Sequence, residues 1–485
     1  MDEKRLGGEG GQMHRRDFLK TAAVAGAALA AAPRIVRAEN LKTDTLNCAV
    51  IGAGNECRVL LSSCVKIPGL QFKGVCDIWP YHRGYTSRLL KAYHHQPKEY
   101  ATHREMLADL KDLDAVIVAS PDWVHAEHAI AAMNAGLHVY CEKEMSNTID
   151  KAREMVLTSR KTGKMLQIGH QRRSNPRYHM ALNYIRNVKA IGRPTSVSGN
   201  WNRHKMLQQE WKRGTELGKE DLEKFGYDTM DRFRNWRWYR KFSGGPIADL
   251  GSHQIDIFHW FLGARPRAVM ADGGIDNYKT LEWYDNVLAV YEWDVPWDGQ
   301  TWTVRGFYQL LSTSSHGGYA ENFLGTEGSL VISEGLGKGG IRREYAAPMA
   351  AWERELAEAV AAKAASLAEL RSEVDMLKKK LAKLEKQHGG APDPEPKKTI
   401  EEELKVGHST PEPGRYYPPI PSPAEPTTEH MPHLANFFEA IRKGDPKHLN
   451  CPGEVGYETA VSVLKVNEAV AAARKIEFKP DDFKA

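Results

Sequence analysis

Short apolar runs alternate with helix-like segments between residues 45 and 168. The runs typical of buried strands are NCAVIG, LQFKGVCD, DAVIVAS, HVYCEK and KMLQIGH. The segments between them carry apolar residues three and four positions apart, the spacing of an amphipathic helix. Strands that alternate with helices at this interval predict an α/β fold with a doubly wound parallel sheet.

After about residue 171 the pattern changes to longer runs in which apolar and polar positions alternate. The clearest of these runs are TSVSGNW, RAVMADGGI, NVLAVYEWD, TVRGFYQLL and GSLVIS. Alternation indicates strands with one covered face, so residues 169–345 are expected to form an α/β substrate-binding domain around an open, mostly antiparallel sheet. Residues 201–241 interrupt these strands with a loop-rich segment of charged and aromatic side chains.

A different pattern fills residues 352–387, where leucine and valine follow a heptad-like spacing of four and three. This seam predicts a long helical insertion. We favour a coiled coil between subunits, and hence a homo-oligomer, over the alternative of a helix packed on its own chain. Residues 388–428 are then a proline-rich linker. Residues 429–485 are expected to form helices that pack back on the body of the protein.

The first 38 residues have the composition of an export signal. Arg15 and Arg16 precede an alanine-rich apolar stretch, and a small-residue cleavage pattern ends at Ala38. Paired arginines in this context predict a twin-arginine signal peptide and a periplasmic or other extracytoplasmic location. The stretch is too short and too weakly apolar for an integral membrane span.

Composition narrows the class of partner. The chain of 485 residues has 67 basic and 62 acidic side chains and a formal net charge of +5. This small excess is spread along the sequence without a basic stripe among stacking aromatics, so we expect no nucleic-acid partner. The 6 cysteines form no C-x-x-C pair and are expected to be small buried apolar residues.

The stretch VIGAGNEC has the strand-to-helix context of a dinucleotide-binding turn. Gly52 permits the tight turn and Gly54 lets the backbone approach a pyrophosphate, whereas Cys57 replaces the usual third glycine. Asp77 ends the next strand, where a carboxylate binds ribose hydroxyls and repels a 2′-phosphate. The predicted cofactor is therefore NAD, and Arg83 leaves NADP open. Residues expected to bind the cofactor are Gly52, Ala53, Gly54, Asn55, Asp77, Ser120, Pro121, His125, Glu142 and Lys143.

Two further stretches contain candidate catalytic residues. HVYCEKEM places Lys143 at the carboxyl end of a strand, the edge at which such sheets bind ligands. In SGGPIADLGSHQIDIFHW, Asp249, His253 and Asp256 recur at helical spacing and share one face. His253 is expected to titrate near neutrality and to accept a hydroxyl proton. A surface lysine and a structural histidine are the alternatives. We expect no metal site, because His253 and its aspartates lack a convincing third ligand.

These stretches resemble the glucose-fructose oxidoreductase / inositol dehydrogenase (Gfo/Idh/MocA) family. SPDWVHAEHAIAAMNAGLHVYCEKEM resembles the family segment that ends in E-K-P, and GGPIADLGSHQIDIFHW resembles its G-G…D-x-G-x-H-x-x-D helix. The resemblance runs from about Leu46 to Ser333 and resumes in the C-terminal helices. It implies an N-terminal Rossmann domain, a C-terminal α/β domain, and a catalytic set that maps to Lys143, Asp249 and His253.

The resemblance also implies a substrate pocket. IGHQRRSNPRY is similar to the strand and turn that line it in the family. The chain departs from the family at Glu144, which stands where the family has a proline, at Cys57, and in the helical insertion. The expected substrate contacts are His170, Arg172, Arg173, Trp236 and Asp256.

The function that the resemblance implies is hydride transfer between a nicotinamide cofactor and a hydroxyl-bearing carbon of a sugar or polyol. His253 would deprotonate the hydroxyl, Lys143 would hold its oxygen, and Asp249 would orient the site. One alternative is a glycosidase that recycles NAD through oxidation, elimination, hydration and reduction. Another is a non-enzymatic, cofactor-binding scaffold assembled through the long helix.

Overall fold

The structure, a computed structural model, describes residues 45–204, 209–334, 339–355, 358, 415–417 and 429–485. The predicted signal peptide lies outside the described residues. So does most of the predicted helix at 352–387, of which residues 352–355 and 358 are described and helical. Within the predicted linker at 388–428, only residues 415–417 are described, and they form a short strand that the sequence pattern did not indicate.

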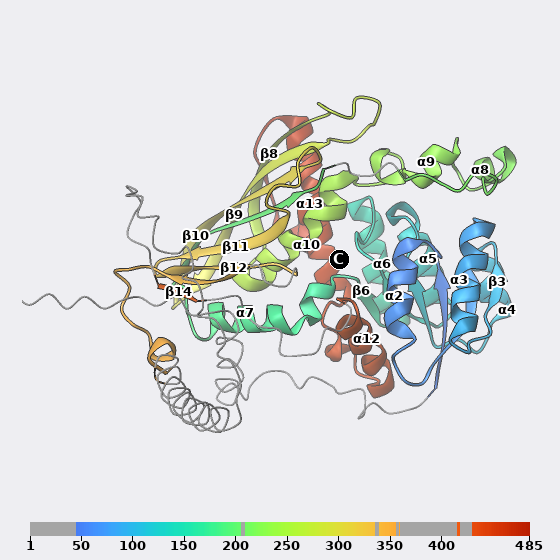
Figure 1. Ribbon diagram of the computed structural model, residues 1–485, viewed down its shortest axis with the longest axis horizontal. Helices are drawn as coiled ribbons and strands as arrows, with labels where there is room; N and C mark the ends of the chain where they lie inside the picture. Colours follow the sequence, from blue (N-terminus) through green and yellow to red (C-terminus); the bar gives the residue numbers. More distant parts are fainter. Residues whose placement is uncertain (1–44, 205–208, 335–338, 356–357, 359–414, 418–428) are drawn as a thin grey trace, which may run out of the picture.

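The first sheet is a parallel Rossmann sheet in the order β3-β2-β1-β4-β5-β6. Its two edge strands, β3 and β6, are labelled in Figure 1. Its strand order reverses between β1 and β4, and such a switch point opens a ligand crevice at the carboxyl ends of the strands. The predicted fold class is confirmed. Its strands are β1 (Leu46–Ile51), β2 (Leu70–Cys76), β3 (Lys98–Tyr100), β4 (Ala115–Val118), β5 (His138–Cys141) and β6 (Leu166–Ile168).

Helices cover both faces of this sheet because its central strands are apolar on both sides. In β1, Ala49 and Ile51 belong to one buried cluster, whereas Cys48 and Val50 belong to the other. The first cluster includes residues of α4 (His103–Asp109), α5 (Asp122–Asn134) and α6 (Ile149–Thr162). The second includes residues of α2 (Asn55–Cys64), α3 (Pro80–Ala92) and α12 (Met431–Lys443). All six cysteines are buried with free thiols.

The second sheet is open, and its neighbouring strands are antiparallel except for the parallel pair β7 and β10. Strand order is β14-β13-β12-β11-β7-β10-β9-β8-β15. Burial alternates along β9, as the sequence pattern predicts for a sheet with one covered face. The strands are β7 (Pro194–Asn202), β8 (Pro266–Gly274), β9 (Asn286–Trp297), β10 (Gln300–Leu311), β11 (Tyr319–Gly325), β12 (Gly328–Ile332), β13 (Gly340–Arg343), β14 (Arg415–Tyr417) and β15 (Ile476–Glu477).

Two long helices join the sheets. α10 (Gly245–Leu262) and α13 (Gly453–Ala472) pack against each other, and α13 also contacts β8 of the second sheet and α6 of the first (Figure 1). α7 (Pro176–Arg186) follows the short turn η2 (Gln171–Ser174) at the end of β6. The predicted C-terminal helices are thus present and pack on the body. No helix among the described residues is both long and apolar enough to span a bilayer.

A long excursion between β7 and α10 carries α8 (Lys219–Lys224), α9 (Met230–Arg234) and η3 (Trp236–Trp238). In Figure 1 these elements extend from the second sheet to a position above the helices of the Rossmann sheet. The second domain therefore contributes residues to the open edge of the first.

Candidate active site

A cavity of about 1070 Å³ lies at the carboxyl edge of the Rossmann sheet and receives side chains from both domains. It includes nine of the ten residues expected to bind the cofactor, together with both candidate catalytic residues of α10. The predicted residues that line it are Gly52, Gly54, Asn55, Asp77, Ser120, Pro121, His125, Glu142, Lys143, Trp236, Asp249 and His253.

The glycine loop has the shape that a dinucleotide requires. Gly52 has φ +89°, and a Cβ at this position would lie 2.4 Å from the backbone nitrogen of Ser120, so a larger residue is excluded. A Cβ on Gly54 would meet nothing nearer than the His82 ring at 3.8 Å, which leaves room for a phosphate. The N-terminus of α2 has no side-chain cap, so its first N–H groups are available to an anion. The Cys57 side chain is buried in the cluster between α2 and the sheet and does not line the cavity among the described residues.

Asp77 supports the glycine loop as well as facing the cavity. Its Oδ2 accepts a hydrogen bond from the Ala53 backbone nitrogen at 2.7 Å, and its Oδ1 accepts one from Trp79 at 2.8 Å. Ala53 itself does not line the cavity in the described part of the chain. The carboxylate retains lone pairs for ribose hydroxyls. Arg83 donates to the Asp77 carbonyl at 2.8 Å.

The candidate catalytic residues come together from distant segments. The Lys143 ammonium lies 3.0 Å from Asp249 Oδ1 and donates to the Asp249 carbonyl at 2.8 Å. Arg237 Nε lies 3.0 Å from Asp249 Oδ2, so the carboxylate bridges two cations. His253 lines the same cavity one helical turn further along α10, with its ring stacked on Trp201 at 5.4 Å. Lys143 reaches the site although Glu144 follows it in place of the proline that the family has there. The Lys143–Glu144 peptide bond is cis.

Sequence family models match three parts of the chain. Residues 46–170 match the oxidoreductase family with an NAD-binding Rossmann fold, and residues 223–331 match the GFO/IDH/MocA C-terminal domain. The chain belongs to the Gfo/Idh/MocA oxidoreductase family. Residues 12–32 match the twin-arginine translocation signal, which confirms that part of the sequence prediction. NAD is accordingly the cofactor of the Rossmann domain.

The names of two proteins similar to this Gfo/Idh/MocA member refer to a polyol and to a sugar derivative. Inositol 2-dehydrogenase of Salmonella typhimurium is 26% identical over 245 residues, which cover 50% of this chain and 58% of that protein. 1,5-Anhydro-D-fructose reductase of Ensifer adhaerens is 38% identical over 238 residues, or 48% of this chain and 61% of that protein. The match thus spans less than two thirds of either relative.

Solved structures reproduce the whole fold at low identity. Aldose-aldose oxidoreductase of Caulobacter crescentus, complexed with glycerol, superimposes with a TM-score of 0.60 and 16% identity. The superposition covers 90% of this chain and 100% of that one. At this identity the similarity establishes a shared architecture.

The charges at the site of this family member are set by burial and by neighbouring ions. Burial lowers the pKa of Lys143, but the Asp249 and Glu142 carboxylates outweigh it and the net pKa is raised. Burial raises the pKa of Asp249, but Lys143 and Arg237 hold it well below its usual range. Lys143 is therefore an ammonium and Asp249 a carboxylate at neutral pH.

The expectation that His253 titrates near neutrality is wrong. Burial, and then the positive charge of Lys143, hold its pKa well below the ordinary value. The imidazole is consequently neutral at pH 7, which is the form that can accept a proton. Its Nδ1 makes no hydrogen bond to any described residue.

Three of the predicted substrate contacts, Arg172, Arg173 and Asp256, are instead buried in ion pairs. Arg172 is 1% exposed and pairs with Glu321 and with Glu334, the latter at 2.9 Å. Arg173 pairs with Asp256 at 2.9 Å, which removes Asp256 from the cavity as well. Neither arginine, nor Asp256, lines the cavity in the described part of the chain. The sequence prediction is wrong for these three because it placed them by motif alone, without their acidic partners from other elements.

The two remaining predicted substrate contacts differ from each other. Trp236 lines the cavity, with the Arg237 guanidinium 4.2 Å from its ring centre. His170 is 1% exposed and does not line the cavity as described. Its two ring nitrogens have no hydrogen-bond partner among the described residues. Trp236 thus remains a candidate contact, whereas His170 lies in the interior.

Several lining residues were not among the individual site residues that the sequence predicted, although the aromatic segment 201–241 as a whole was expected to face a sugar ring. Trp201 stacks between His253 and Tyr319, with the Tyr319 ring centre 4.6 Å away. Arg237 holds Asp249, and Gln171 and Glu334 line the cavity too. The only signal for Trp201 and Arg237 was the aromatic and charged composition of 201–241. Tyr319 sits on a strand, β11, that the pattern did not indicate.

One end of the cavity is acidic. Glu142 is buried, and burial followed by the negative charge of Glu56 raises its pKa to about 8. Glu56, Glu142 and His430 bring possible metal-ligating atoms within 4.8 Å of one another. The expectation of no metal site did not consider this group, because its members come from α2, from the residue after β5 and from the residue before α12.

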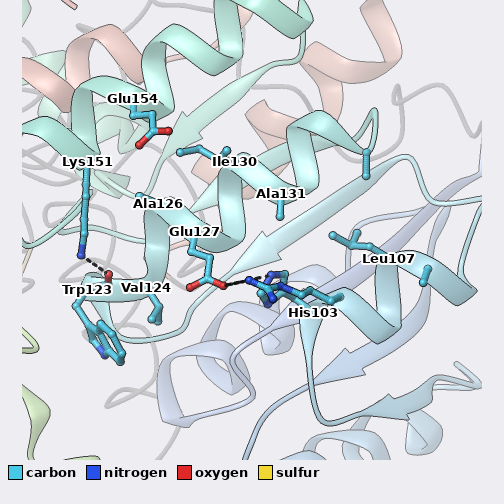
Figure 2. Close-up of a pocket in the computed structure, with 13 residues that line it drawn as sticks. His103, Leu107, Trp123, Val124, Ala126, Glu127, Ile130, Ala131, Lys151 and Glu154 are labelled. Atoms are coloured by element: carbon cyan, nitrogen blue, oxygen red, sulfur yellow. Dashed lines mark hydrogen bonds and ion pairs between the residues drawn. The ribbon is translucent and has the colours of Figure 1, made fainter. Parts of the chain in front are cut away.

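A second hollow of about 620 Å³ lies on the outer side of α5 (Figure 2). Glu127 pairs with Arg104 at 3.1 Å. Figure 2 shows Lys151 donating to the Trp123 carbonyl. No member of the Lys143, Asp249 and His253 set lines this hollow among the described residues. The larger cavity is therefore the candidate active site.

Proposed function

We propose that this protein is an exported, NAD-dependent dehydrogenase that oxidises or reduces a sugar or polyol at a hydroxyl-bearing carbon. The observation that carries the proposal is one cavity lined by the glycine loop, a lysine ammonium and a neutral imidazole. The names of the similar proteins, which act on inositol and anhydrofructose, support the substrate class. The twin-arginine signal supports a periplasmic or other extracytoplasmic location.

The side chains divide the proton chemistry between them. His253, neutral at pH 7, accepts the proton of the substrate hydroxyl, and a positioned base of this kind contributes roughly 10²–10⁴-fold to the rate. Lys143 donates a hydrogen bond to the same oxygen and offsets the negative charge that develops on it. Asp249 fixes the ammonium through two contacts and remains ionised. Bound NAD supplies the hydride acceptor.

The cavity also has surfaces suited to a carbohydrate. Trp201, Tyr319 and Trp236 line it and offer flat apolar faces, while Gln171 and Arg237 supply polar groups. Aromatic side chains combine a large apolar area with fixed geometry, which suits the C–H face of a sugar ring. Hydrogen bonds from the polar groups would orient its hydroxyls.

The test is turnover of the purified full chain with NAD on a panel of polyols, sugars and glycosides. His253→Ala should lower kcat/KM by roughly 10²–10⁴-fold, while the Kd for NAD stays unchanged. Lys143→Met should lower kcat/KM as well. His316→Ala, which alters an exposed histidine of the second domain, is the matched control.

Full activity in His253→Ala would show that the base is assigned to the wrong residue. Release of an aglycone without accumulation of NADH would instead identify the glycosidase that recycles its cofactor. The two outcomes are separated by measuring NADH absorbance and aglycone in the same reaction.

A further inference from the structure

The segment 209–241 of the second domain is attached to the Rossmann domain at the turn after β2. Trp79, two residues beyond Asp77, donates its indole N–H to the Thr215 carbonyl. The ring of Phe233 packs edge-on against the same indole, with ring centres 5.7 Å apart. The segment is thus fixed next to the residue expected to bind the cofactor ribose.

A second attachment lies after β4. Trp123, in the first turn of α5, donates its indole N–H to the Tyr227 hydroxyl at 3.1 Å. Tyr227 in turn packs on Phe242, with ring centres 4.8 Å apart. In Figure 2 the Trp123 indole projects from this end of α5.

These two attachments flank the glycine loop. In the sheet order, β2 and β4 are the two neighbours of β1, and the glycine loop follows β1. A segment bound to the ends of both neighbours must cross the crevice between them. The crevice at this switch point is where a dinucleotide binds in such folds.

Segment 209–241 brings three cations to the cavity, Lys224, Arg234 and Arg237, of which Arg237 pairs with Asp249; Arg234 is the last residue of α9. It lines the same cavity as Gly54 and Asn55, and its guanidinium lies 5.1 Å from the centre of the Trp79 ring. Its Nε is buried and makes no hydrogen bond to a described residue, and its Nη2 has only long contacts of 3.4 Å, to Gln209 and Glu210. Among the described residues no carboxylate forms an ion pair with it.

An unpaired, half-buried guanidinium is unfavourable unless an anion completes its surroundings. Burial, and then the positive charge of Arg58, lower the pKa of Arg234, which reflects that environment. The anion expected in this cavity is the pyrophosphate of NAD, because Gly54 and the N-terminus of α2 form its cradle. A planar guanidinium binds phosphate oxygens with two hydrogen bonds.

We propose that residues 209–241 form a cofactor strap, in which Arg234 binds the pyrophosphate of the NAD held by the Rossmann domain. The strap supplies from the second domain a phosphate ligand that the glycine loop lacks. Dissociation of the cofactor then requires Arg234 to release it. The proposal rests on NAD binding alone, so it is independent of which substrate is oxidised.

The test measures ligand binding to the full chain without substrate. Arg234→Gln should raise the Kd for NADH and for ADP-ribose by roughly 10- to 100-fold, the factor that corresponds to one charge-assisted hydrogen bond. The Kd for adenosine, which lacks phosphate, should change less than about twofold. The Kd of Arg234→Lys for NADH should lie between those of the wild type and Arg234→Gln, because lysine keeps the charge but lacks the planar guanidinium. The dissociation rate of NADH, measured by displacement, should rise in parallel.

Arg213→Gln is the matched control, because Arg213 is exposed on the same segment and does not line the cavity as described. An unchanged Kd for NADH in Arg234→Gln would overturn the proposal. So would an equal loss for adenosine, which would indicate collapse of the segment, or a loss confined to NADP, which would place Arg234 at the 2′-phosphate. If no sugar or polyol is turned over but the Kd for NADH still depends on Arg234, only the proposed substrate class is contradicted.

Discussion

Replacing Arg172 with methionine tests the correction that this side chain stabilises the fold and does not contact the substrate. Arg172 and Glu321 have side chains that are 1% and 0% exposed, and Glu334 is 4% exposed. Methionine retains the length of the side chain but removes the charge. Two buried carboxylates then lose their shared counter-ion.

The size of the effect follows from burial. Removal of one partner from a buried ion pair costs about 3–5 kcal/mol of unfolding free energy. Burial raises the pKa of Glu321 to about 7 even with Arg172 beside it, against an ordinary value of 4.5. Without Arg172 this pKa rises further. At about pH 6 Glu321 can therefore take up a proton, which limits the loss of unfolding free energy, whereas at about pH 8 the full loss is expected. The loss of stability should therefore grow with pH.

Thermal unfolding at both pH values measures this loss. At about 2 °C per kcal/mol, Arg172→Met should lower Tm by roughly 6–10 °C at the higher pH. Adding Glu321→Gln should restore part of the loss, because fewer charges remain unpaired. Arg104→Met is the control: it breaks an arginine–glutamate pair at 3.1 Å whose arginine is 80% exposed, and should cost at most about 1 kcal/mol.

Kinetics at a temperature at which the variant is folded complete the test. KM for the substrate should stay within about twofold of the wild type, because Arg172 does not reach the cavity. An unchanged Tm together with a KM raised about tenfold or more would refute the reasoning and restore Arg172 as a substrate contact.

Two further substitutions test the glutamate that replaces the family proline and the cysteine that replaces the third glycine. Burial raises the pKa of Glu144 from 4.5 to about 8, so the wild type loses stability as pH rises through that interval. The unfolding free energy of Glu144→Gln should therefore exceed that of the wild type by about 2–4 kcal/mol near pH 9 and by little near pH 5. Parallel Tm curves for the two proteins between these pH values would contradict this. Cys57→Gly should lower stability by about 1–3 kcal/mol, because a buried side chain is lost and glycine is unfavourable within a helix, while the Kd for NADH stays within about twofold. A markedly tighter Kd would show that the cysteine impairs the phosphate cradle.

Local pattern was sufficient for most of the Rossmann domain. Five of its six strands are mainly apolar runs in which most residues are buried, which is why their positions were predictable. β3, in contrast, has the polar sequence KEY and pairs only at the sheet edge. The turn at Gly52 and the spacing of Asp249 and His253 are properties of a few consecutive residues. Their chemistry was therefore visible in the sequence, and the structure places them in one cavity.

Only the tertiary structure determined the ion pairs, the charge state of His253 and the contacts between segment 209–241 and the Rossmann domain. Each of these depends on residues that are distant in the chain. Arg172 and Arg173 have the composition of ligand-binding residues, but Glu321, Glu334 and Asp256 pair with them in the interior. Likewise, the neutrality of His253 comes from burial beside Lys143, 110 positions earlier in the numbering. The crossing of 209–241 over the glycine loop depends on Trp79 and Trp123, two indoles whose partners no local pattern identifies.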